Sequence, residues 1–303
     1  MTAIAGSAAG RNKSGAQGVE IHPLSAAVGA EIRGVDLACV TAAQFAEIER
    51  AWIRHSALLF RGQRLDHDEL LNFSRRFGEL DPPPVNENGK KFVEGYPEIY
   101  VVSNIIGADG TPIGSLGAGE AVWHTDMSYL PEPPDASLLY AVEIPPTGGD
   151  TWLCGMIAAC ESLPQALRSA VAGRSIKHDG TYNSGGYLRA GLTDSNDPMN
   201  SVGTAHPIIC AHPPSGNHTL YLGRRRNAYV VGMPLDESER LLDELWAHAA
   251  RPEHAFAHRW RIGDVLMWDN RTTLHRRDPF DSAARRLMYR TQIKGKAKPQ
   301  RAL

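Results

Sequence analysis

The chain has 303 residues, enough for one large β or mixed domain or for two small ones. Hydrophobic residues make up 42%, so a sizeable core can form, and the formal net charge is −2. Because the charges nearly balance, the composition gives no reason to expect a nucleic-acid or membrane partner. No apolar run approaches the ~18 residues that a membrane-spanning helix requires. The four cysteines form no Cys-x-x-Cys pair, which leaves a zinc-ribbon or redox-pair interpretation without support.

The first 19 residues are rich in Gly, Ala and Ser and contain few large apolar side chains. Such a segment cannot bury enough surface to order itself, so residues 1–19 are predicted to form a flexible tail. The same segment lacks the apolar stretch of a secretory signal, and we therefore expect a cytoplasmic protein. A short basic tail is predicted at 296–303, which leaves 20–295 as a single domain.

The N-terminal part of that domain predicts three strands. Apolar and polar residues alternate over 19–22 and again over 30–37, which is typical of half-buried strands. The apolar run 57–60 is short enough to be a fully buried strand.

Two helices are predicted between and after these strands. Thr41 is a good N-cap, and the apolar residues after it recur at helical spacing. Asp66 followed by Glu69 resembles a capping box, and the helix that it opens is expected to end at Gly78. Both helices are expected to pack against a sheet.

Two segments are predicted to lie outside regular structure. Residues 81–120 contain three consecutive prolines, a strand at 99–102, and five glycines between 107 and 119. The glycine-rich part is either a mobile segment at the mouth of a site or an ordinary surface insertion. Residues 179–205 also lack a regular pattern, and their tyrosines and asparagine among glycines favour a lid over a disordered loop.

The stretch 121–129 carries the first chemical motif. In an extended strand, residues i and i+2 point to the same face, so His124 and Asp126 can hold one metal ion from one side. His275, which follows a strand-like segment and a turn, is the best candidate for a third ligand. Two histidines and one carboxylate form the facial triad of non-haem Fe(II) oxygenases and leave three coordination positions open. A His-x-Asp pair alone also occurs as a structural feature, so the assignment depends on the rest of the chain.

The C-terminal half predicts further elements in order. A strand at 137–144 ends at two glycines, and a helix is expected to follow Thr151, with Pro164 interrupting it. The segments 207–210 and 219–222 flank a turn and predict a hairpin. Asp236 and Glu239 are expected to cap another helix that ends before Pro252. Residues 256–261 and 265–268 predict a second hairpin.

The last strand, 285–293, alternates strongly and places Arg286 and Arg290 on one face. Four residues of strand separate them by ~13 Å, too far for both to grip one carboxylate. They are well placed to bind two different anions on either side of a metal, because a guanidinium offers two parallel donors to a carboxylate. The alternative is a solvated strand face.

These motifs, taken in order, resemble the TauD/TfdA family of Fe(II)- and 2-oxoglutarate-dependent dioxygenases. The resemblance covers residues 20–295 and rests on five motifs: His124-Thr125-Asp126, Gly148-Gly149-Asp150-Thr151, Trp268-Asp269-Asn270-Arg271, His275, and Arg285-Arg286-Leu287-Met288-Tyr289-Arg290. It implies a mainly β fold, with a jelly-roll core (a double-stranded β-helix) and flanking helices.

The resemblance also implies roles for individual residues. His124, Asp126 and His275 would be the iron ligands. Arg286 would bind the distal carboxylate of 2-oxoglutarate, with Thr151 as a second donor to it. Arg290 would anchor an anionic group of the primary substrate.

The implied reaction consumes O₂ and 2-oxoglutarate, releases succinate and CO₂, and hydroxylates a small anionic substrate. The family's taurine enzyme uses a His and an Asn near the iron, whereas this chain has Glu120 four residues before His124 and no His just after Gly78. A carboxylate substrate, such as an aryloxyalkanoate, is therefore favoured over a sulfonate. Residues 224–226 are three arginines that either add positive charge to the pocket or lie on a solvated face.

Other classes of protein remain as alternatives. A metal-dependent hydrolase can use His and carboxylate ligands but needs neither the arginine pair nor Thr151. A metal-free binding module of jelly-roll type would not need His124, Asp126 and His275 to converge. Members of the family are often dimers or tetramers, so a homo-oligomer is expected.

Overall fold

The computed structural model describes residues 18–81, 92–118, 121–183, 185–189, 191–194 and 197–302. The predicted N-terminal tail lies outside these ranges except for its last two residues. The predicted C-terminal tail contains a short strand, β19 (Gln300–Arg301), which pairs with β12 (Ile209–Ala211). Across the described ranges, no helix combines the length and the apolar character needed to span a membrane.

A nine-stranded sheet, the large sheet, and a four-stranded sheet, the small sheet, dominate the molecule. The nine-stranded sheet has the order β1-β2-β3-β16-β8-β18-β5-β4, with β6 paired to β5. Its strands are β1 (Glu20–Pro23), β2 (Ala30–Arg33), β3 (Ala57–Phe60), β4 (Phe92–Val93), β5 (Tyr96–Ser103), β6 (Ser115–Leu116), β8 (Ala136–Glu143), β16 (Val265–Asp269) and β18 (Leu287–Ile293). The four-stranded sheet has the order β15-β9-β17-β7. Its strands are β7 (Ala121–His124), β9 (Thr151–Gly155), β15 (Ala255–His258) and β17 (Thr273–Arg277).

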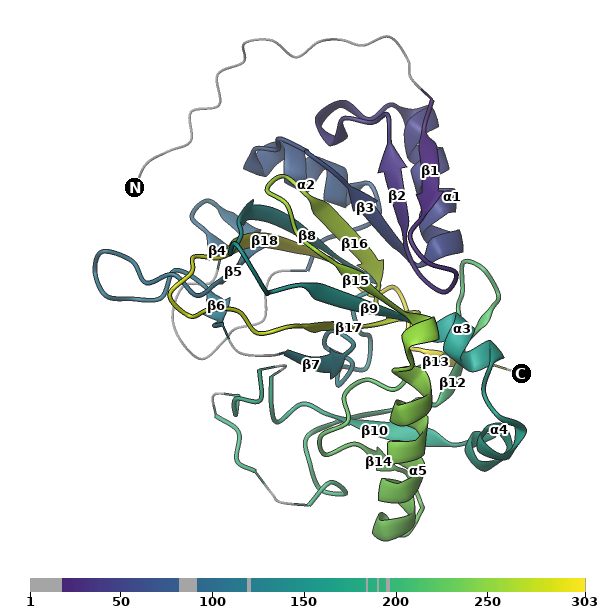
Figure 1. Ribbon diagram of the computed structural model, residues 1–303. Coiled ribbons are helices and arrows are strands. Elements are labelled where there is room, and N and C mark those ends of the chain that lie inside the picture. Colours follow the sequence, from purple (N-terminus) through teal and green to yellow (C-terminus); the bar gives the residue numbers. More distant parts are fainter. Residues whose placement is uncertain are drawn as a thin grey trace, which may run out of the picture.

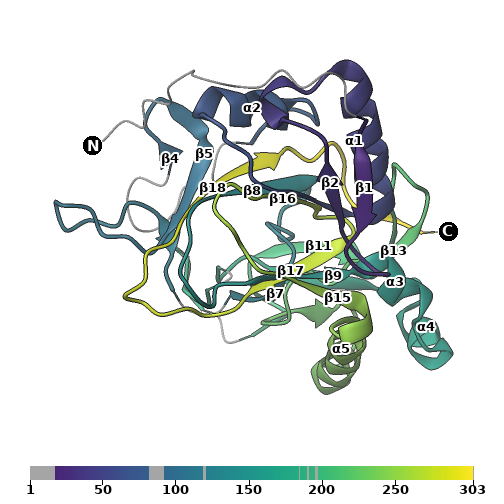
Figure 2. The ribbon, with the colours of Figure 1, turned by 45° about the horizontal axis from the view of Figure 1, so that its top comes forward.

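The two sheets face each other, as Figure 2 shows for β8, β16 and β18 above β7, β9 and β17. Between them lies an apolar core to which both sheets contribute. Its members include Leu153 from the small sheet and Tyr100, Leu139, Leu266 and Met288 from the large one. This arrangement confirms the predicted mainly β architecture.

Helices cover the outer faces of both sheets (Figure 1). The helices α1 (Ala42–His55) and α2 (His67–Arg75) pack on the large sheet through residues such as Ile48 and Phe73. The helices α3 (Met156–Glu161) and α5 (Leu235–Ala249) pack behind the small sheet, where Leu242 and Leu245 meet Leu274 of β17. A further helix, α4 (Gln165–Val171), contacts α5. The sheets are thus held between two helical layers.

Two three-stranded sheets and two short 3₁₀ helices complete the described fold. One sheet has the order β11-β10-β14 and the other β13-β12-β19. The remaining bounds are β10 (Ser175–Asp179), β11 (Gly203–Pro207), β13 (His218–Leu220), β14 (Tyr229–Val230), η1 (Leu37–Cys39) and η2 (Pro252–His254). The predicted hairpin at 207–222 is confirmed, because β12 and β13 pair antiparallel.

The predicted starts of the two N-terminal helices are confirmed, because a capping box is present at each. Thr41 caps α1, and its hydroxyl accepts from the Gln44 amide at 3.2 Å while the Gln44 side chain accepts from the Thr41 amide at 3.0 Å. Asp66 and Glu69 form the same reciprocal box at α2, with distances of 2.8 and 3.0 Å. The helix α2 ends at Arg75, before the predicted stop at Gly78.

The cap predicted for α5 is wrong. The helix begins at Leu235 after Pro234, and its N-terminus has no side-chain cap. Asp236 and Glu237 instead lie in its first turn, where negative charge interacts favourably with the helix dipole.

The structure also corrects the prediction for 151–155. Residues 151–155 form strand β9, and the helix begins only at Met156. A short apolar run followed by helix formers does not distinguish a buried strand from the first turn of a helix. Residues 151–155 form a strand because they pair with both β15 and β17.

The hairpin predicted for 256–268 is wrong. Strand β15 pairs with β9 in the small sheet, whereas β16 pairs with β3 and β8 in the large sheet. The buried Asp264 holds the corner between them, because its Oδ2 lies 2.6 Å from Arg61 Nη1 and accepts from the Arg261 amide at 2.8 Å. The connection therefore carries the chain from one sheet to the other.

Candidate active site

The two histidines of the predicted triad face each other across paired strands. Strands β7 and β17 are antiparallel, and His124 and His275 are register partners. Directly opposed residues project to the same side of a sheet, and the imidazole centroids are 4.0 Å apart. His275 lies in strand β17, which follows strand β16 and a turn at 270–272, in agreement with the predicted strand and turn before it.

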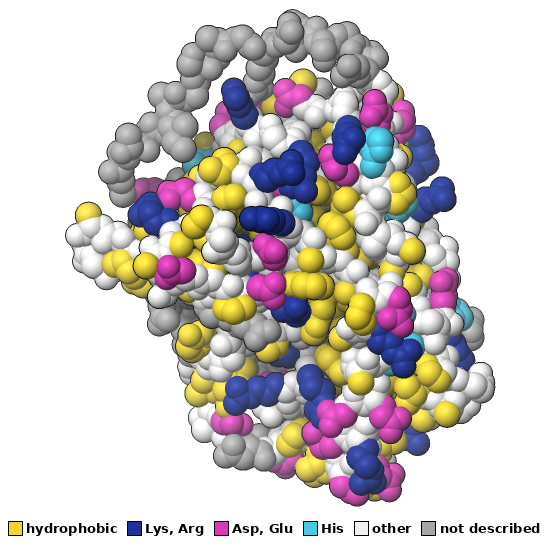
Figure 3. Space-filling model, in the orientation of Figure 1, with side chains coloured by type: hydrophobic (Ala, Val, Ile, Leu, Met, Phe, Trp, Pro, Cys, Tyr) yellow, Lys and Arg dark blue, Asp and Glu magenta, His cyan; other side chains and the backbone are white. Residues whose placement is uncertain are grey.

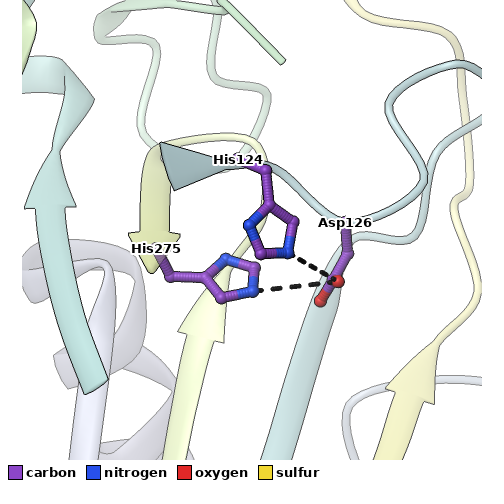
Figure 4. A group of neighbouring side chains, drawn as sticks. All are labelled: His124, Asp126 and His275. Atoms are coloured by element: carbon purple, nitrogen blue, oxygen red, sulfur yellow. Dashed lines mark ion pairs between the residues drawn. The ribbon is translucent and has the colours of Figure 1, made fainter. Parts of the chain in front are cut away.

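Asp126 joins the pair from a turn. Strand β7 ends at His124, so the expectation of one continuous strand through Asp126 is wrong in its local detail. Met127 has a left-handed backbone with φ of 46°, and the Thr125 amide donates to Gly223 O at 3.1 Å. The turn points the carboxylate at both imidazoles (Figure 4), with Asp126 Oδ1 at 3.8 Å from each Nε2.

The protonation states of this group suit a metal. His124 Nδ1 lies 2.7 Å from Val122 O, so we assign the proton to Nδ1, which leaves the Nε2 lone pair directed at Asp126. Burial lowers the pKa of His275 to about 4 and holds the pKa of His124 well below its ordinary value. Burial opposes ionisation of Asp126, but the pKa of its carboxyl is still lowered, chiefly because the charge of Arg290 lies 3.3 Å away.

The result is two neutral imidazoles and one carboxylate, all buried, with their ligand atoms within 4.8 Å of one another. Nitrogen and carboxylate oxygen donors of this kind suit a divalent transition metal. The predicted convergence of His124, Asp126 and His275 is present.

A hydrogen-bonded chain in the large sheet fixes the carboxylate from behind. Ser137 Oγ donates to Asp126 Oδ2 at 2.7 Å and accepts from Asn270 Nδ2 at 3.1 Å and Gln292 Nε2 at 3.3 Å. Asn270 Oδ1 accepts from Trp268 Nε1 at 3.0 Å, and the Trp268 ring lies 4.6 Å from the His275 ring. These contacts thus connect Asp126 and His275 through side chains that are themselves buried.

Sequence reasoning missed Ser137 entirely. The signal was only a serine in the mostly apolar strand β8, which does not by itself reveal a role. The register supplies it, because Trp268, Ser137 and Gln292 are neighbours in one row across β16, β8 and β18.

The triad opens into a cavity with several arginines. Its lining residues are Val102, Ala121, His124, Leu139, Thr151, Trp268, His275, Arg276, Arg277, Arg286 and Arg290. No Asp or Glu belongs to this set among the described residues. On the surface, by contrast, basic and acidic side chains are interspersed over the face in Figure 3. The cavity therefore concentrates positive charge that the overall balance of the chain does not reveal.

Arg286 and Thr151, the predicted pair for the cosubstrate, both line this cavity. Arg286 is 2% exposed, and its backbone is held by Asn104 Oδ1 at 2.9 Å and Ser103 Oγ at 2.7 Å. Burial, and then the charge of Arg277, lowers the pKa of Arg286 to about 9. Thr151 Oγ1 accepts from Trp260 Nε1 at 3.0 Å, which leaves its own hydroxyl proton available to donate.

Arg290 lines the same cavity as Arg286, as predicted, although β18 begins only at Leu287 and has a register shift between Leu287 and Met288. Its Nη1 lies 3.3 Å from Asp126 Oδ1, and its guanidinium carbon stands 4.8 Å from the Tyr100 ring centroid. The structure thus places Arg290 against the carboxylate of the triad. Its role as substrate anchor stays a prediction.

The three consecutive arginines at 224–226 divide between different environments. Arg225 lies 2.6 Å from Glu239 Oε2, and Arg226 stacks 3.3 Å over the Tyr182 ring. Arg224 is buried, donates to Tyr182 O, and leaves its Nε without a hydrogen-bond partner. Its charge also lowers the pKa of His124, so it faces the triad side of the fold.

The two predicted lid segments are only partly described. Gly119 and Glu120 lie outside the described residues, as do positions 184, 190, 195 and 196. The described part of the second segment runs between β10 and β11 and places Tyr182 in a buried position. Whether either segment moves stays a prediction.

Comparison with known proteins agrees with this geometry. The family model described as taurine catabolism dioxygenase TauD, TfdA family matches residues 20–292. The chain is 32% identical over 298 residues to an (S)-phenoxypropionate/alpha-ketoglutarate-dioxygenase of Delftia acidovorans, covering 94% of this chain and 98% of that protein. It is 35% identical over 280 residues to an alpha-ketoglutarate-dependent 2,4-dichlorophenoxyacetate dioxygenase of Cupriavidus pinatubonensis, covering 89% and 94%.

A solved structure agrees with the fold as well. The crystal structure of AAD-2 in complex with Mn(II) and N-oxalylglycine matches with a TM-score of 0.77 at 27% identity, covering 93% of this chain and 99% of that one. A family match over nearly the whole chain and relatives above 30% identity agree with the triad and its cavity. The chain therefore belongs to the TauD/TfdA family of alpha-ketoglutarate-dependent dioxygenases.

Proposed function

We propose that this enzyme uses Fe(II), O₂ and 2-oxoglutarate (alpha-ketoglutarate) to hydroxylate a small carboxylate substrate such as an aryloxyalkanoate, releasing succinate and CO₂. One observation carries the proposal: a buried His₂-Asp group opens into a cavity that contains several arginines and, among its described lining residues, no acid. Such a site suits a divalent metal together with anionic organic ligands.

His124, Asp126 and His275 would hold the iron. When bound, that iron supplies the one-electron and O₂ chemistry that protein side chains lack. Ser137 keeps one carboxylate oxygen of Asp126 engaged at 2.7 Å, which directs the other toward the imidazoles. Trp268 and Leu139 give the cavity apolar walls that exclude water from the reaction.

Arg286 and Thr151 would bind the distal carboxylate of 2-oxoglutarate. Both are buried and line the cavity that contains the histidines. N-oxalylglycine, the ligand in the AAD-2 structure, is 2-oxoglutarate with NH in place of one methylene group. A shared fold with that complex supports the same class of cosubstrate here.

The names of two relatives support the choice of substrate. Phenoxypropionate and 2,4-dichlorophenoxyacetate are both aryloxyalkanoates, and both proteins match this chain over most of its length. Hydroxylation beside an ether oxygen gives a hemiacetal or hemiketal, which breaks down to a phenol and a 2-oxo acid. The substrate carboxylate requires a cation, and we assign Arg290 to it, with the buried Arg224 as the second candidate.

Substrate assays with purified enzyme test this proposal. Under anaerobic conditions, Fe(II) and 2-oxoglutarate together should produce a weak visible absorption band, and Asp126→Ala should abolish it. In air, a panel of aryloxyacetates, aryloxypropionates and taurine should release phenol only from the aryloxy acids, with one succinate per phenol. Absence of the band and of succinate formation would refute the cofactor assignment. Turnover of taurine alone would move the substrate to the sulfonates.

A further inference from the structure

Two buried arginines approach the cosubstrate end of the cavity from opposite sheets. Arg286 stands immediately before β18 of the large sheet, and Arg277 ends β17 of the small sheet, two residues after His275. Arg277 is also the register partner of Thr151, so both project into the space between the sheets. The family resemblance implied only Arg286 and Thr151 as partners of the distal carboxylate.

Their charges act on each other in a poorly solvated place. Arg277 is 7% exposed, and burial lowers its pKa to about 10. The charge of Arg277 also contributes to the lowered pKa of Arg286. A carboxylate that reaches both guanidiniums would be attracted by two cations in a place where water screens charge weakly.

The aromatic ring of Phe280 lies near both arginines. The centroid of Phe280 lies 5.4 Å from the guanidinium carbon of Arg277 and 5.9 Å from that of Arg286. Gly149 has φ of +71° and donates its amide to Pro279 O at 3.2 Å, which ties the loop carrying Phe280 to the turn before β9. A Cβ on Gly149 would stand 3.4 Å from the Phe280 ring and 3.7 Å from Arg286 Nε. The glycine therefore lets the backbone come close to both groups.

We propose that Arg277 is a second cation for the distal carboxylate of 2-oxoglutarate, which would be clamped between Arg277 and Arg286, receive a hydrogen bond from Thr151, and be covered by Phe280. This inference rests on the proposed function and adds to it a determinant of cosubstrate selectivity. A 2-oxo acid with a distal carboxylate would contact both arginines, whereas an acid without one would make neither of these charged contacts.

Two ligands isolate the contribution of the distal carboxylate. 2-Oxopentanoate has the 2-oxo acid head and the chain length of 2-oxoglutarate but ends in a methyl group. Affinities of both acids are measured by anaerobic calorimetry on the Mn(II)-loaded enzyme, which avoids any dependence on turnover. The wild type should prefer 2-oxoglutarate by a large factor.

Arg277→Gln removes the charge but keeps the side-chain carbons through Cδ, and Arg277→Ala removes the side chain beyond Cβ. Each should weaken 2-oxoglutarate binding by at least tenfold and change 2-oxopentanoate binding by less than about twofold. Arg277→Lys should recover part of the loss. Arg285→Ala is the matched control, because Arg285 adjoins Arg286 but is exposed and paired with Glu143 at 2.8 Å; its variant should bind both acids like the wild type.

The possible results distinguish an error about the role of Arg277 from an error about the cosubstrate. Equal loss of affinity for both acids in the Arg277→Gln variant would make Arg277 a structural residue and overturn the inference. Unchanged 2-oxoglutarate affinity would overturn it as well. If the wild-type enzyme shows no preference for the dicarboxylic acid, the proposed cosubstrate itself is wrong. If Arg277→Ala does not fold, Arg277→Gln alone decides.

Discussion

Ser137→Ala tests whether the hydrogen-bonded chain behind the triad positions the metal ligand. The change removes a single oxygen that donates to Asp126 Oδ2 at 2.7 Å and accepts from two side-chain amides. Ser137 is fully buried, so water does not readily replace what is lost. Asp126 would keep its charge but lose the contact that fixes the rotation of its carboxylate.

The hydrogen bonds of Ser137 determine how much stability and metal affinity the substitution should remove. A hydrogen bond to a charged group contributes roughly 1.5–3 kcal/mol, and each buried amide left without an acceptor costs about 1–3 kcal/mol. The amides of Asn270 and Gln292 both lose their acceptor, so we expect a loss of about 2–4 kcal/mol in the free energy of unfolding, allowing for partial relaxation. Metal affinity should fall by roughly 10- to 100-fold, as for other residues that orient a metal ligand.

Metal affinity is measured anaerobically by competition with a chromophoric chelator, and stability by urea denaturation of the metal-free protein. Thr291→Val is the matched control. Thr291 Oγ1 and Ser74 Oγ are 2.8 Å apart on the outer face of β18, so this variant also loses a buried hydroxyl. It should lose about 1 kcal/mol of stability and keep its metal affinity.

Destabilisation without weaker metal binding would refute the reasoning. In that case Ser137 would support the sheet but not the ligand. Ser137→Thr provides a check in the other direction, because it retains a hydroxyl and should restore most of the metal affinity if its extra methyl group is tolerated.

Four further predictions follow from the site. Asp126→Ala removes the sole anionic member of the triad and should abolish succinate formation with the circular dichroism spectrum unchanged; near wild-type turnover would exclude Asp126 as a ligand. Arg286→Ala should weaken 2-oxoglutarate binding by roughly 2–4 kcal/mol, or on the order of 30- to 1000-fold, and Thr151→Val by about 1 kcal/mol; equal affinities in calorimetry would mean that another group holds the cosubstrate. Arg290→Ala should keep 2-oxoglutarate binding but weaken the aryloxy acid and release succinate without matching phenol; a one-to-one ratio at full affinity would point to Arg224 instead. The metal-free protein should lose stability as pH falls from about 6.5 toward 4. Over this range His275 becomes protonated in the unfolded chain but stays neutral in the folded protein, where burial lowers its pKa to about 4. Urea midpoints that do not change over this range would contradict a neutral His275 in the folded protein.

Much of this protein was readable from local patterns. The capping boxes at Thr41 and Asp66 involve only residues three apart, so the helix starts follow from the chain alone. Alternation along the last strand likewise placed Arg286 and Arg290 on one face, because the side-chain period of a strand is fixed. The order of the five motifs carried the resemblance to the family. Each of these features depends on residues that are near one another in the sequence or on the motifs themselves.

Tertiary structure decided which distant residues meet. The register of β7 against β17 sets His124 opposite His275, and a shift of one residue would turn one imidazole to the other face of the sheet. The row that contains Ser137 and the placement of Arg277 beside Thr151 depend on pairing in the same way. Propensity cannot supply such information, because backbone hydrogen bonds between strands are the same for every side chain. Only the pairing of the two sheets showed which serine and which arginine line the site.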